Sequence, residues 1–338
     1  MVTDARAGAP SDGRGLMRWT VIGGSGFVGG AVLKALAGAG EEALPVRAPR
    51  VTSEARTPLE LLADADRQSA VVDLLARELA GSAVVVNAAG AAAPRSPESL
   101  QLTGANALLP VLIARACAAA GVPRFVHLSS AAVQGHRPVL DESPDTAPFS
   151  PYSRSKALGE RALRMIPPGE SEIVSIRATS VQGIERPTTA ALARLAASPL
   201  ASVASPGTAP SPVASVDALA ELVRTVGSHE GQLPQIVLQP WEGMTVRTVL
   251  EATGGTPLVL PRSLCRVILR TGYTVSALLG ERLHGSVRRV ELMWFGQDQV
   301  AGWTAEEGVV LPSRVSSILE EAGARRRGRR QPRGSGQE

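Results

Sequence analysis

Residues 20 to 40 constrain the fold more than any other part of this chain. They place five glycines within eight positions, between a short apolar run and an alanine-rich run, in the sequence TVIGGSGFVGGAVLKALAGAG. Gly23, Gly26 and Gly29 give the spacing GxxGxxG directly after a predicted strand and before a helix predicted over 27–39. The first glycine permits a tight turn, the second lets a pyrophosphate approach the backbone, and the third lets the helix lie close to the sheet. This stretch therefore predicts a dinucleotide site at the helix N-terminus.

Strand and helix patterns alternate along the first half of the chain. Amphipathic runs predict helices at 67–80 and 98–120, and a third, short strand is expected somewhere within 50–62. Such alternation calls for parallel strands joined by right-handed crossovers. The predicted fold class is therefore α/β, with a Rossmann-type doubly wound parallel sheet. The other expected strands are at 18–24, 42–48, 83–90, 124–130 and 172–181.

The composition changes near residue 184, after which Pro, Ser, Thr and Ala dominate. We expect residues 18–183 to form an NAD(P)-binding Rossmann domain that also carries the catalytic residues. Residues 184–321 are expected to form a smaller C-terminal substrate-binding lobe over the carboxyl edge of the sheet. Its predicted helices are short and lie around 188–197 and 216–226.

The pI near 9.6 comes from one end of the chain. Residues 322–338 hold six Arg against one Glu, so they account for more than the whole formal charge of +4. They predict a disordered basic tail, and residues 1–17 predict a disordered leader. Because the body is not basic and only 3% of residues are aromatic, no nucleic-acid partner is predicted. The two cysteines form no metal-ligand spacing, which indicates a reducing cytoplasm and no metal site.

No run of about 18 consecutive apolar residues exists, so no transmembrane segment is predicted. The nearest approach is the sequence LCRVILRTGYTVSALLG at 264–280, which Arg266 and Arg270 interrupt. An interfacial helix is one reading of this stretch. We favour the other, a helix packed on the body with its arginines in solvent.

Tyr152 and Lys156 lie four residues apart at the start of a predicted helix, so they share one face. A phenol with an ordinary pKa near 10 exchanges protons poorly at pH 7, and a neighbouring ammonium stabilises its phenolate. The pair comes shortly after the predicted strand at 124–130, which ends in Ser129 and Ser130. Since ligands bind at the carboxyl edge of such sheets, Ser130 could polarise a carbonyl while Tyr152 moves the proton. Alternatively, the two serines only cap the strand end.

The residues after the second predicted strand bear on the choice of dinucleotide. Sites for NAD usually carry a carboxylate there, which binds the ribose 2′-hydroxyl. This chain has Arg47 and Arg50 instead. Guanidinium groups bind phosphate oxygens with paired donors, so NADP(H) is favoured over NAD(H). The alternative is that both are ordinary surface arginines.

Several motifs in order along residues 20–320 give the chain a family likeness. They are GGSGFVG at 23–29, NAAG at 87–90, Asn106, SSAAVQG at 129–135, Glu142 with Pro144, SPYSRSK at 150–156 and IRATSVQG at 176–183. In these motifs the chain resembles the extended short-chain dehydrogenase/reductase superfamily, the NAD(P)-dependent epimerase/dehydratase family.

The resemblance implies roles for matching positions. Tyr152 would be the general acid/base, Lys156 would lower its pKa and hold the nicotinamide ribose, and Ser130 would bind the reacting oxygen. Asp66 would contact the adenine, and a homodimer could form through helices 98–120 and 152–166. The implied cofactor contacts are Gly23, Ser25, Gly26, Phe27, Val28, Gly29, Arg47, Arg50, Asp66, Asn87, Ala88, Ala89, Gly90, Asn106, Tyr152, Lys156, Thr179 and Val181.

The expected function is hydride transfer at a carbonyl or hydroxyl carbon of a nucleotide-sugar-like substrate, as in a 4-epimerase. The alternatives are an NADPH-dependent ketoreductase of a non-sugar metabolite and a non-catalytic redox sensor that binds the dinucleotide. Sugar-nucleotide 4,6-dehydratases of the family carry an Asp-Glu pair where Ala131 and Ala132 stand here. Because eliminating water needs an added acid and base, dehydratase activity is disfavoured.

Overall fold

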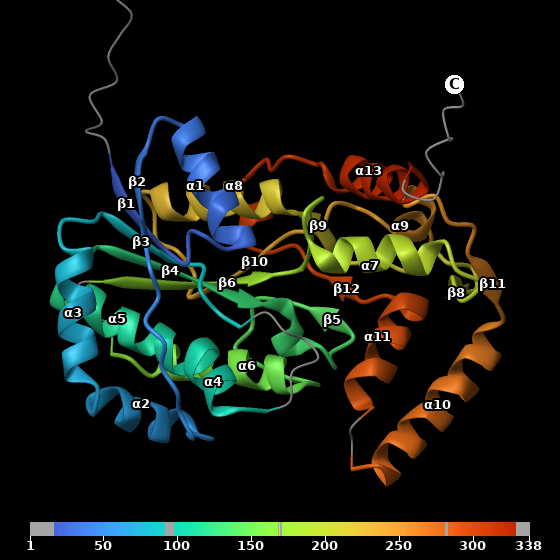
Figure 1. Cartoon of the computed structure of the whole chain (residues 1–338), viewed down its shortest axis with the longest axis horizontal. Coiled ribbons are helices and arrows are strands. Elements are labelled where there is room, and N and C mark those ends of the chain that lie inside the picture. The colour runs from blue at the N-terminus through green and yellow to red at the C-terminus, as the bar shows by residue number, and fades with distance from the viewer. Residues whose placement is uncertain (1–16, 92–97, 168, 170, 281–282, 329–338) are drawn as a thin grey trace, which may run out of the picture.

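A six-stranded, all-parallel sheet forms the centre of the molecule, with helices on both faces (Figure 1). The computed structural model describes residues 17–91, 98–167, 169, 171–280 and 283–328. The strand order is β10-β6-β4-β3-β1-β2. This topology confirms the predicted α/β class and the parallel, doubly wound sheet. The strands are β1 (Arg18–Ile22), β2 (Glu42–Val46), β3 (Val84–Asn87), β4 (Arg124–Ser130), β6 (Glu172–Ala178) and β10 (Ile236–Leu238).

Two apolar cores, one on each face, hold the helices to this sheet. On one face, the side chains of α1 (Phe27–Gly38) and α8 (Val216–Ser228) pack over Trp19, Val86 and Val126. On the other, a core around Phe125 seats the remaining helices. They are α3 (Ser69–Leu79), the continuous run α4 (Leu100–Thr103), η1 (Gly104–Leu108) and α5 (Leu109–Ala119), and α6 (Pro151–Arg164).

The prediction of a third, short strand within 50–62 is wrong. These residues, all described by the structure, contain no strand, and their second half begins helix α2 (Pro58–Asp66). A local signal explains the helix. Thr57 and Glu60 form a capping box, and Pro58 occupies the first turn. β2, which contains Pro45, is therefore the edge of the sheet, where a missing backbone donor is tolerated.

After residue 184, α8 and β10 still belong to the main sheet and its helix layer, and the rest of the chain adds small two-stranded sheets and further helices beside the carboxyl edge of that sheet (Figure 1). Two helices of this half were expected, at 188–197 and 216–226, and are confirmed as α7 (Pro187–Ala196) and α8. The paired strands are β7 (Ser180–Gln182) with β9 (Val213–Ser215), β8 (Ser202–Ala204) with β11 (Leu258–Leu260), and β5 (Val139–Leu140) with β12 (Asp298–Gln299). The remaining helical elements are η2 (Ala131–Gln134), α9 (Val246–Ala252), α10 (Arg262–Leu278), α11 (His284–Phe295), α12 (Trp303–Glu306) and α13 (Val315–Gly328).

The predicted disordered tail begins too early. Residues 322–328 form the last turns of α13, which packs on α7 and α9. Ala322 and Gly323 are buried there, and a Cβ at Gly323 would lie 2.3 Å from the Thr253 carbonyl oxygen. Small side chains on one face therefore let this arginine-rich segment fold against the body. Residues 329–338 of the tail and residues 1–16 of the leader lie outside the described residues.

The helix predicted within 264–280 forms as α10, which packs against α11 with Arg266 and Arg270 exposed, as expected, although only through a narrow face. Along α10 only Cys265, Leu269 and Ser276 are buried. The segment Leu100–Ala119 is the one helical stretch of the described chain long and apolar enough to cross a membrane. It lies mostly inside the body, 72% buried, as a core helix does.

Candidate functional site

The turn after β1 has no room for side chains. Gly23 has a φ of +85°, and a Cβ on it would lie 2.7 Å from the Ala89 nitrogen. A Cβ on Gly29 would lie 2.2 Å from the Gly23 carbonyl oxygen. Gly26 precedes α1 as its N-cap, and among the described residues no side chain caps that helix. The first amides of α1 therefore face outward without a side-chain partner, which suits an anionic group such as a pyrophosphate.

Ser130, Tyr152 and Lys156, drawn from two separate segments of the chain, line one cavity of about 130 Å³. Ser130 ends β4, and the other two lie one turn apart at the start of α6. Other predicted cofactor contacts that line the same cavity are Val28, Ala88, Ala89, Gly90, Thr179 and Val181.

Local sequence fixes the start of α6. Ser150 and Ser153 cap it reciprocally, and Pro151 occupies the first turn. The cap leaves Tyr152 in the first turn of the helix and Lys156 in the second, on one side. The geometry expected from the YxxxK spacing is thus present.

Three influences act on the pKa of the partly buried Tyr152. Burial raises this pKa above its ordinary value, and a hydrogen bond with Ser130 and the positive charge of Arg186 offset only part of the rise. The resemblance gave the role of lowering this pKa to Lys156. In the structure the Lys156 ammonium instead donates to the Leu128 carbonyl oxygen at 2.8 Å. Arg186 is therefore the cation that acts on the phenol in this arrangement.

Burial also acts on Lys156 itself. It lowers the pKa of the ammonium to about 8, and the charge of Glu160 acts in the opposite direction. The folded protein thus releases this proton at a lower pH than the unfolded chain does.

We expect this difference to appear in the pH dependence of stability. Above about pH 8 the unfolded chain binds more protons at Lys156 than the folded chain, so the free energy of unfolding should rise with pH up to the ordinary lysine range. The Lys156→Met variant lacks the titrating group, so its free energy of unfolding should rise less over the same pH interval. Denaturant midpoints of both proteins, measured at about pH 7.5 and about pH 9.5, test this expectation. Equal pH dependence in the two proteins would contradict it.

Asn87 and Asn106 lie behind the cavity rather than in its lining. Asn87 is buried, accepts from the Ala89 nitrogen at 3.1 Å and contacts His127 Nδ1 at 3.2 Å. Asn106 accepts from the Ala91 nitrogen at 2.9 Å and donates to the Ala91 carbonyl oxygen at 3.2 Å. Both amides therefore shape the turn after β3, and their predicted direct contact with a cofactor is replaced by this supporting role.

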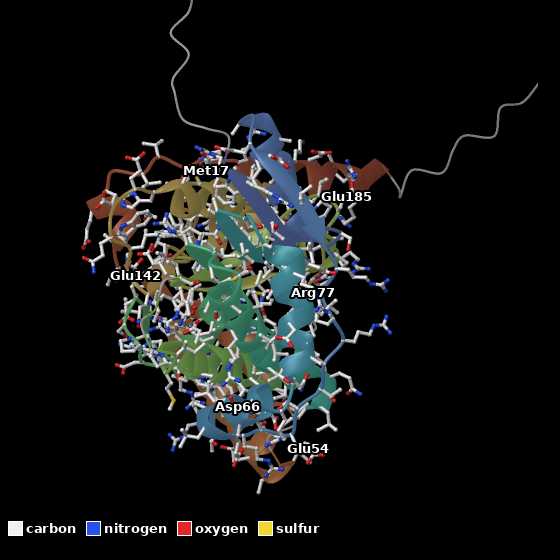
Figure 2. All side chains as sticks on the ribbon, turned by 90° about the vertical axis from the view of Figure 1, so that its left-hand side faces the viewer. Met17, Glu54, Asp66, Arg77, Glu142 and Glu185 are labelled. Atoms are coloured by element: carbon white, nitrogen blue, oxygen red, sulfur yellow. The ribbon has the colours of Figure 1, made fainter. Side chains whose placement is uncertain are left out.

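The structure does not bring Asp66 to the cavity. Asp66 ends α2, is mostly exposed, and pairs with Arg115 at 2.8 Å. Figure 2 shows it at the opposite end of the molecule from Glu185, the neighbour of Arg186. The resemblance gave Asp66, which directly precedes the helix predicted over 67–80, as an adenine contact. In the structure Asp66 ends α2, away from the cavity.

Arg47 and Arg50 line a separate surface cavity of about 490 Å³ beyond the end of β2. Glu78 of α3 lines it as well, so a carboxylate that the sequence places 31 residues away from Arg47 accompanies the two arginines. Ser25 and Gly26 are exposed at the start of α1.

Sequence reasoning missed Arg186. Its guanidinium carbon lies 5.4 Å from the centre of the Phe27 ring, and its Nη1 donates to the Val181 carbonyl oxygen. The residue stands directly before Pro187, which begins α7. A lone arginine in a predicted loop carries no pattern, so only its position in the fold identifies it.

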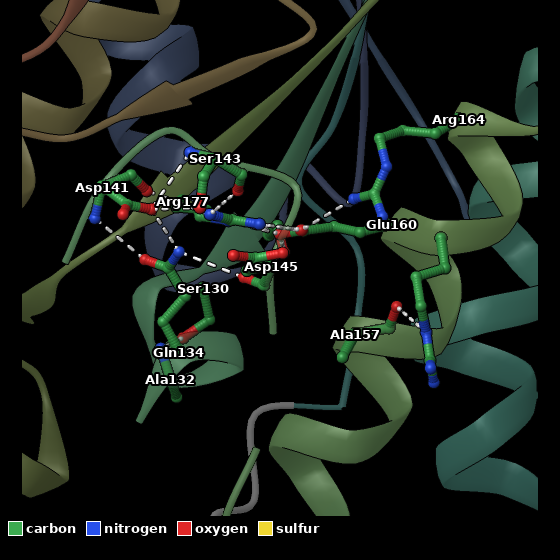
Figure 3. Close-up of polar contacts among 12 residues, drawn as sticks. Ser130, Ala132, Gln134, Asp141, Ser143, Asp145, Ala157, Glu160, Arg164 and Arg177 are labelled. Carbon is green, nitrogen blue, oxygen red and sulfur yellow. Dashed lines mark hydrogen bonds and ion pairs between the residues drawn. The ribbon is translucent and has the colours of Figure 1, made fainter. Parts of the chain in front are cut away.

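A buried ion pair also escaped the sequence analysis. Arg177 on β6 and Glu160 on α6 are fully buried and pair at 2.8 Å (Figure 3). The Arg177 guanidinium also donates to the carbonyl oxygens of Asp141 and Ser143, and Ser129 Oγ donates to Glu160. This network fixes the end of β4 to α6, so it positions the segments that carry Ser130 and Tyr152.

The parallel sheet, the glycine turn and the adjacent Ser-Tyr-Lys cavity define a Rossmann-type dinucleotide-binding protein. The chain belongs to the NAD dependent epimerase/dehydratase family, whose sequence model matches residues 19–221. The family resemblance expected from the motifs is thus confirmed.

Particular relatives extend this comparison. A UDP-glucose 4-epimerase of Azospirillum brasilense is 31% identical over 169 residues, which cover 48% of this chain and 46% of the relative. The match thus spans about half of that relative's length.

Solved structures show the same fold at low sequence identity. One is a UDP-glucuronic acid 4-epimerase from Bacillus cereus in complex with NAD, at a TM-score of 0.59 and 17% identity, covering 90% of this chain and 94% of the other. Another is RMD from Pseudomonas aeruginosa complexed with NADPH, at a TM-score of 0.57 and 17% identity, covering 93% and 99%. The first of these structures holds NAD and the second NADPH, and at this identity both show that the fold is shared.

Proposed function

We propose that this protein is an oxidoreductase or epimerase that transfers a hydride at a carbonyl or hydroxyl carbon of a nucleotide-sugar-like substrate, with Tyr152 as its general acid/base. The observation that carries the proposal is that Ser130, Tyr152 and Lys156 line one cavity beside the glycine turn. A non-catalytic redox sensor has no chemical need for all three groups. Residues 18–183 would hold the cofactor, and residues 184–321 would bind most of the substrate.

The residues present fit a nicotinamide dinucleotide. The outward amides of α1 would hold the pyrophosphate, and Lys156 with Thr179 and Val181 would surround the nicotinamide end. When bound there, this group supplies a carbon that accepts or donates a hydride.

The side chains of the cavity would divide the remaining work. Ser130 would donate a hydrogen bond to the reacting oxygen and hold it within reach of the Tyr152 hydroxyl. Tyr152 would give or take the proton at that oxygen. Arg186 would stabilise the phenolate when Tyr152 is deprotonated, since its charge opposes the rise that burial causes in the pKa of Tyr152.

An arginine-rich cavity supports an anionic substrate. Arg186 also lines a second cavity of about 540 Å³, between α7 and α13, together with Arg194, Arg325 and Arg326. One carboxylate, Glu185, lines it too and pairs with Arg325 at 3.2 Å, so the arginines outnumber the acid. Guanidinium groups suit phosphate oxygens, and Arg186 borders both cavities. A substrate with its sugar beside Tyr152 and its diphosphate toward these arginines agrees with the nucleotide sugars named for the related epimerases.

Of the two dinucleotides, we propose NADP(H) rather than NAD(H) as the cofactor. Arg47 and Arg50 border one cavity after β2, where a 2′-phosphate would be recognised. The presence of Glu78 in the same cavity is the feature that speaks for NAD(H).

Turnover of the cofactor separates the two candidate reactions. We expect the purified protein to oxidise NADPH in stoichiometric amounts when a UDP-4-keto sugar is added, because Arg47 and Arg50 favour the phosphorylated cofactor of a reductase. Absorbance at the nicotinamide band and chromatography of the sugar measure this. If a UDP-hexose with a C4 hydroxyl, supplied in a parallel assay, is inverted at C4 while the cofactor stays unchanged, the epimerase candidate replaces the reductase. If neither occurs with any nucleotide sugar, the substrate class is wrong.

A further inference from the structure

We propose that α10 docks on an anionic lipid surface through an exposed apolar stripe, on a helix whose charged side chains are all arginines. Nine of the 17 exposed large apolar side chains among the described residues lie within 258–283. Elsewhere such side chains are scattered, which is ordinary for a protein surface. Their concentration on one segment therefore calls for a partner.

The stripe follows the helical repeat. Val267 and Ile268 follow Leu264 by three and four residues. Val275 follows Ile268 by seven residues, and Leu278 follows Val275 by three. These intervals place all five side chains on one face of α10. Val267 is 62% exposed and Leu278 is 81% exposed. The exposed residues Leu279, Leu258 and Val259 extend the apolar surface at the two ends.

The opposite side of α10 is the one that packs on the body. Cys265, Leu269 and Ser276 are buried there, and α11 lies against this side. Figure 1 shows α10 at the margin of the molecule, away from the main sheet, with α11 on its inner side. The apolar stripe is thus directed outward, at a place where a flat surface can reach it.

The positive charge of α10 indicates that its partner is anionic. α10 carries Arg262, Arg266 and Arg270, all exposed, and no Asp or Glu in its sequence. Arg270 lies next to the stripe on the helical repeat, whereas Arg262 stacks on Phe295 of α11, 5.3 Å from the centre of its ring. An apolar face on a helix that has arginines and no carboxylates matches a bilayer surface with anionic headgroups, where the apolar side chains enter the acyl boundary. A second copy of this chain fits less well, since α10 paired with α10 would bring like charges together.

Vesicle co-sedimentation tests this inference with the full-length protein. We expect binding to vesicles of phosphatidylcholine containing about one third phosphatidylglycerol, and at least about tenfold weaker binding to phosphatidylcholine alone. The double variant Val267→Gln with Leu278→Gln should bind the anionic vesicles at least about tenfold less than the wild type. Both side chains are exposed, so the variant should keep the wild-type unfolding midpoint.

The control removes equally exposed apolar side chains from other places. Leu59→Gln with Val310→Gln, at positions 68% and 90% exposed, should bind vesicles as the wild type does. Because the basic tail stays intact in every variant, unchanged binding of the α10 variant would assign the binding to the tail and overturn the proposal. Absence of vesicle binding, or a dimer by light scattering that the α10 variant dissociates, would overturn it as well.

Discussion

Replacing Tyr152 by Phe should lower kcat by roughly 10²- to 10⁴-fold, the usual contribution of a positioned general acid/base. The change removes one oxygen and keeps the ring that lines the cavity beside Lys156. The affinity for the dinucleotide should therefore stay nearly unchanged. Steady-state turnover together with calorimetric titration of the cofactor measures the two effects separately.

The chain offers one matched control. Tyr273 is its only other tyrosine, and the hydroxyl of Tyr273 donates to Glu291 between α10 and α11. Tyr273→Phe should leave kcat near the wild-type value. A Tyr152→Phe protein with wild-type kcat would remove the proposed mechanism, even if both variants bind the cofactor.

Replacing Arg177 by Ala should lower the free energy of unfolding by about 3–5 kcal/mol. The variant leaves Glu160 fully buried, without the guanidinium that pairs with it at 2.8 Å. It also removes the donor to the carbonyl oxygens of Asp141 and Ser143 (Figure 3). The denaturant midpoint, measured by circular dichroism, gives the change.

An exposed pair of the same chemistry serves as the control. Arg247 and Glu251 pair at 2.7 Å, with both side chains close to half exposed. Arg247→Ala should change the free energy of unfolding by only about 0–1 kcal/mol, because solvent screens this pair. The double variant Arg177→Met with Glu160→Gln should recover part of the loss, since no uncompensated charge stays buried. Equal losses in the buried and the exposed single variants would contradict this account.

Where local rules decide the structure, the sequence was a good guide. The GxxGxxG turn, the starts of the five expected strands and the start of α6 depend on backbone freedom, side-chain periodicity and capping, all of which act over a few residues. The prediction of a third strand was wrong for a reason that is also local. The apolar pattern there was weak, and the capping box of Thr57 and Glu60 begins a helix instead.

The composition of the cavity depended on contacts between distant segments. Ser130 and Tyr152 were predicted to meet because parallel strands present their ends at one edge. Arg186 could not be foreseen, since the position of a guanidinium beside Tyr152 depends on how the turn after β7 folds over α1. The predicted adenine contact of Asp66 also depended on tertiary structure. Helix α2 carries Asp66 to Arg115, with which it forms an ion pair.

The amino-acid sequence alone determined the class of fold, the glycine turn and the helical face shared by Tyr152 and Lys156, because steric and hydrogen-bonding preferences of neighbouring residues are enough for these. Only the tertiary structure decided which cation acts on the phenol, which acid and base are buried as a pair, and that the apolar stripe of α10 faces outward. Burial and electrostatic interaction are properties of residues far apart in the chain, and they exist only after the chain has folded.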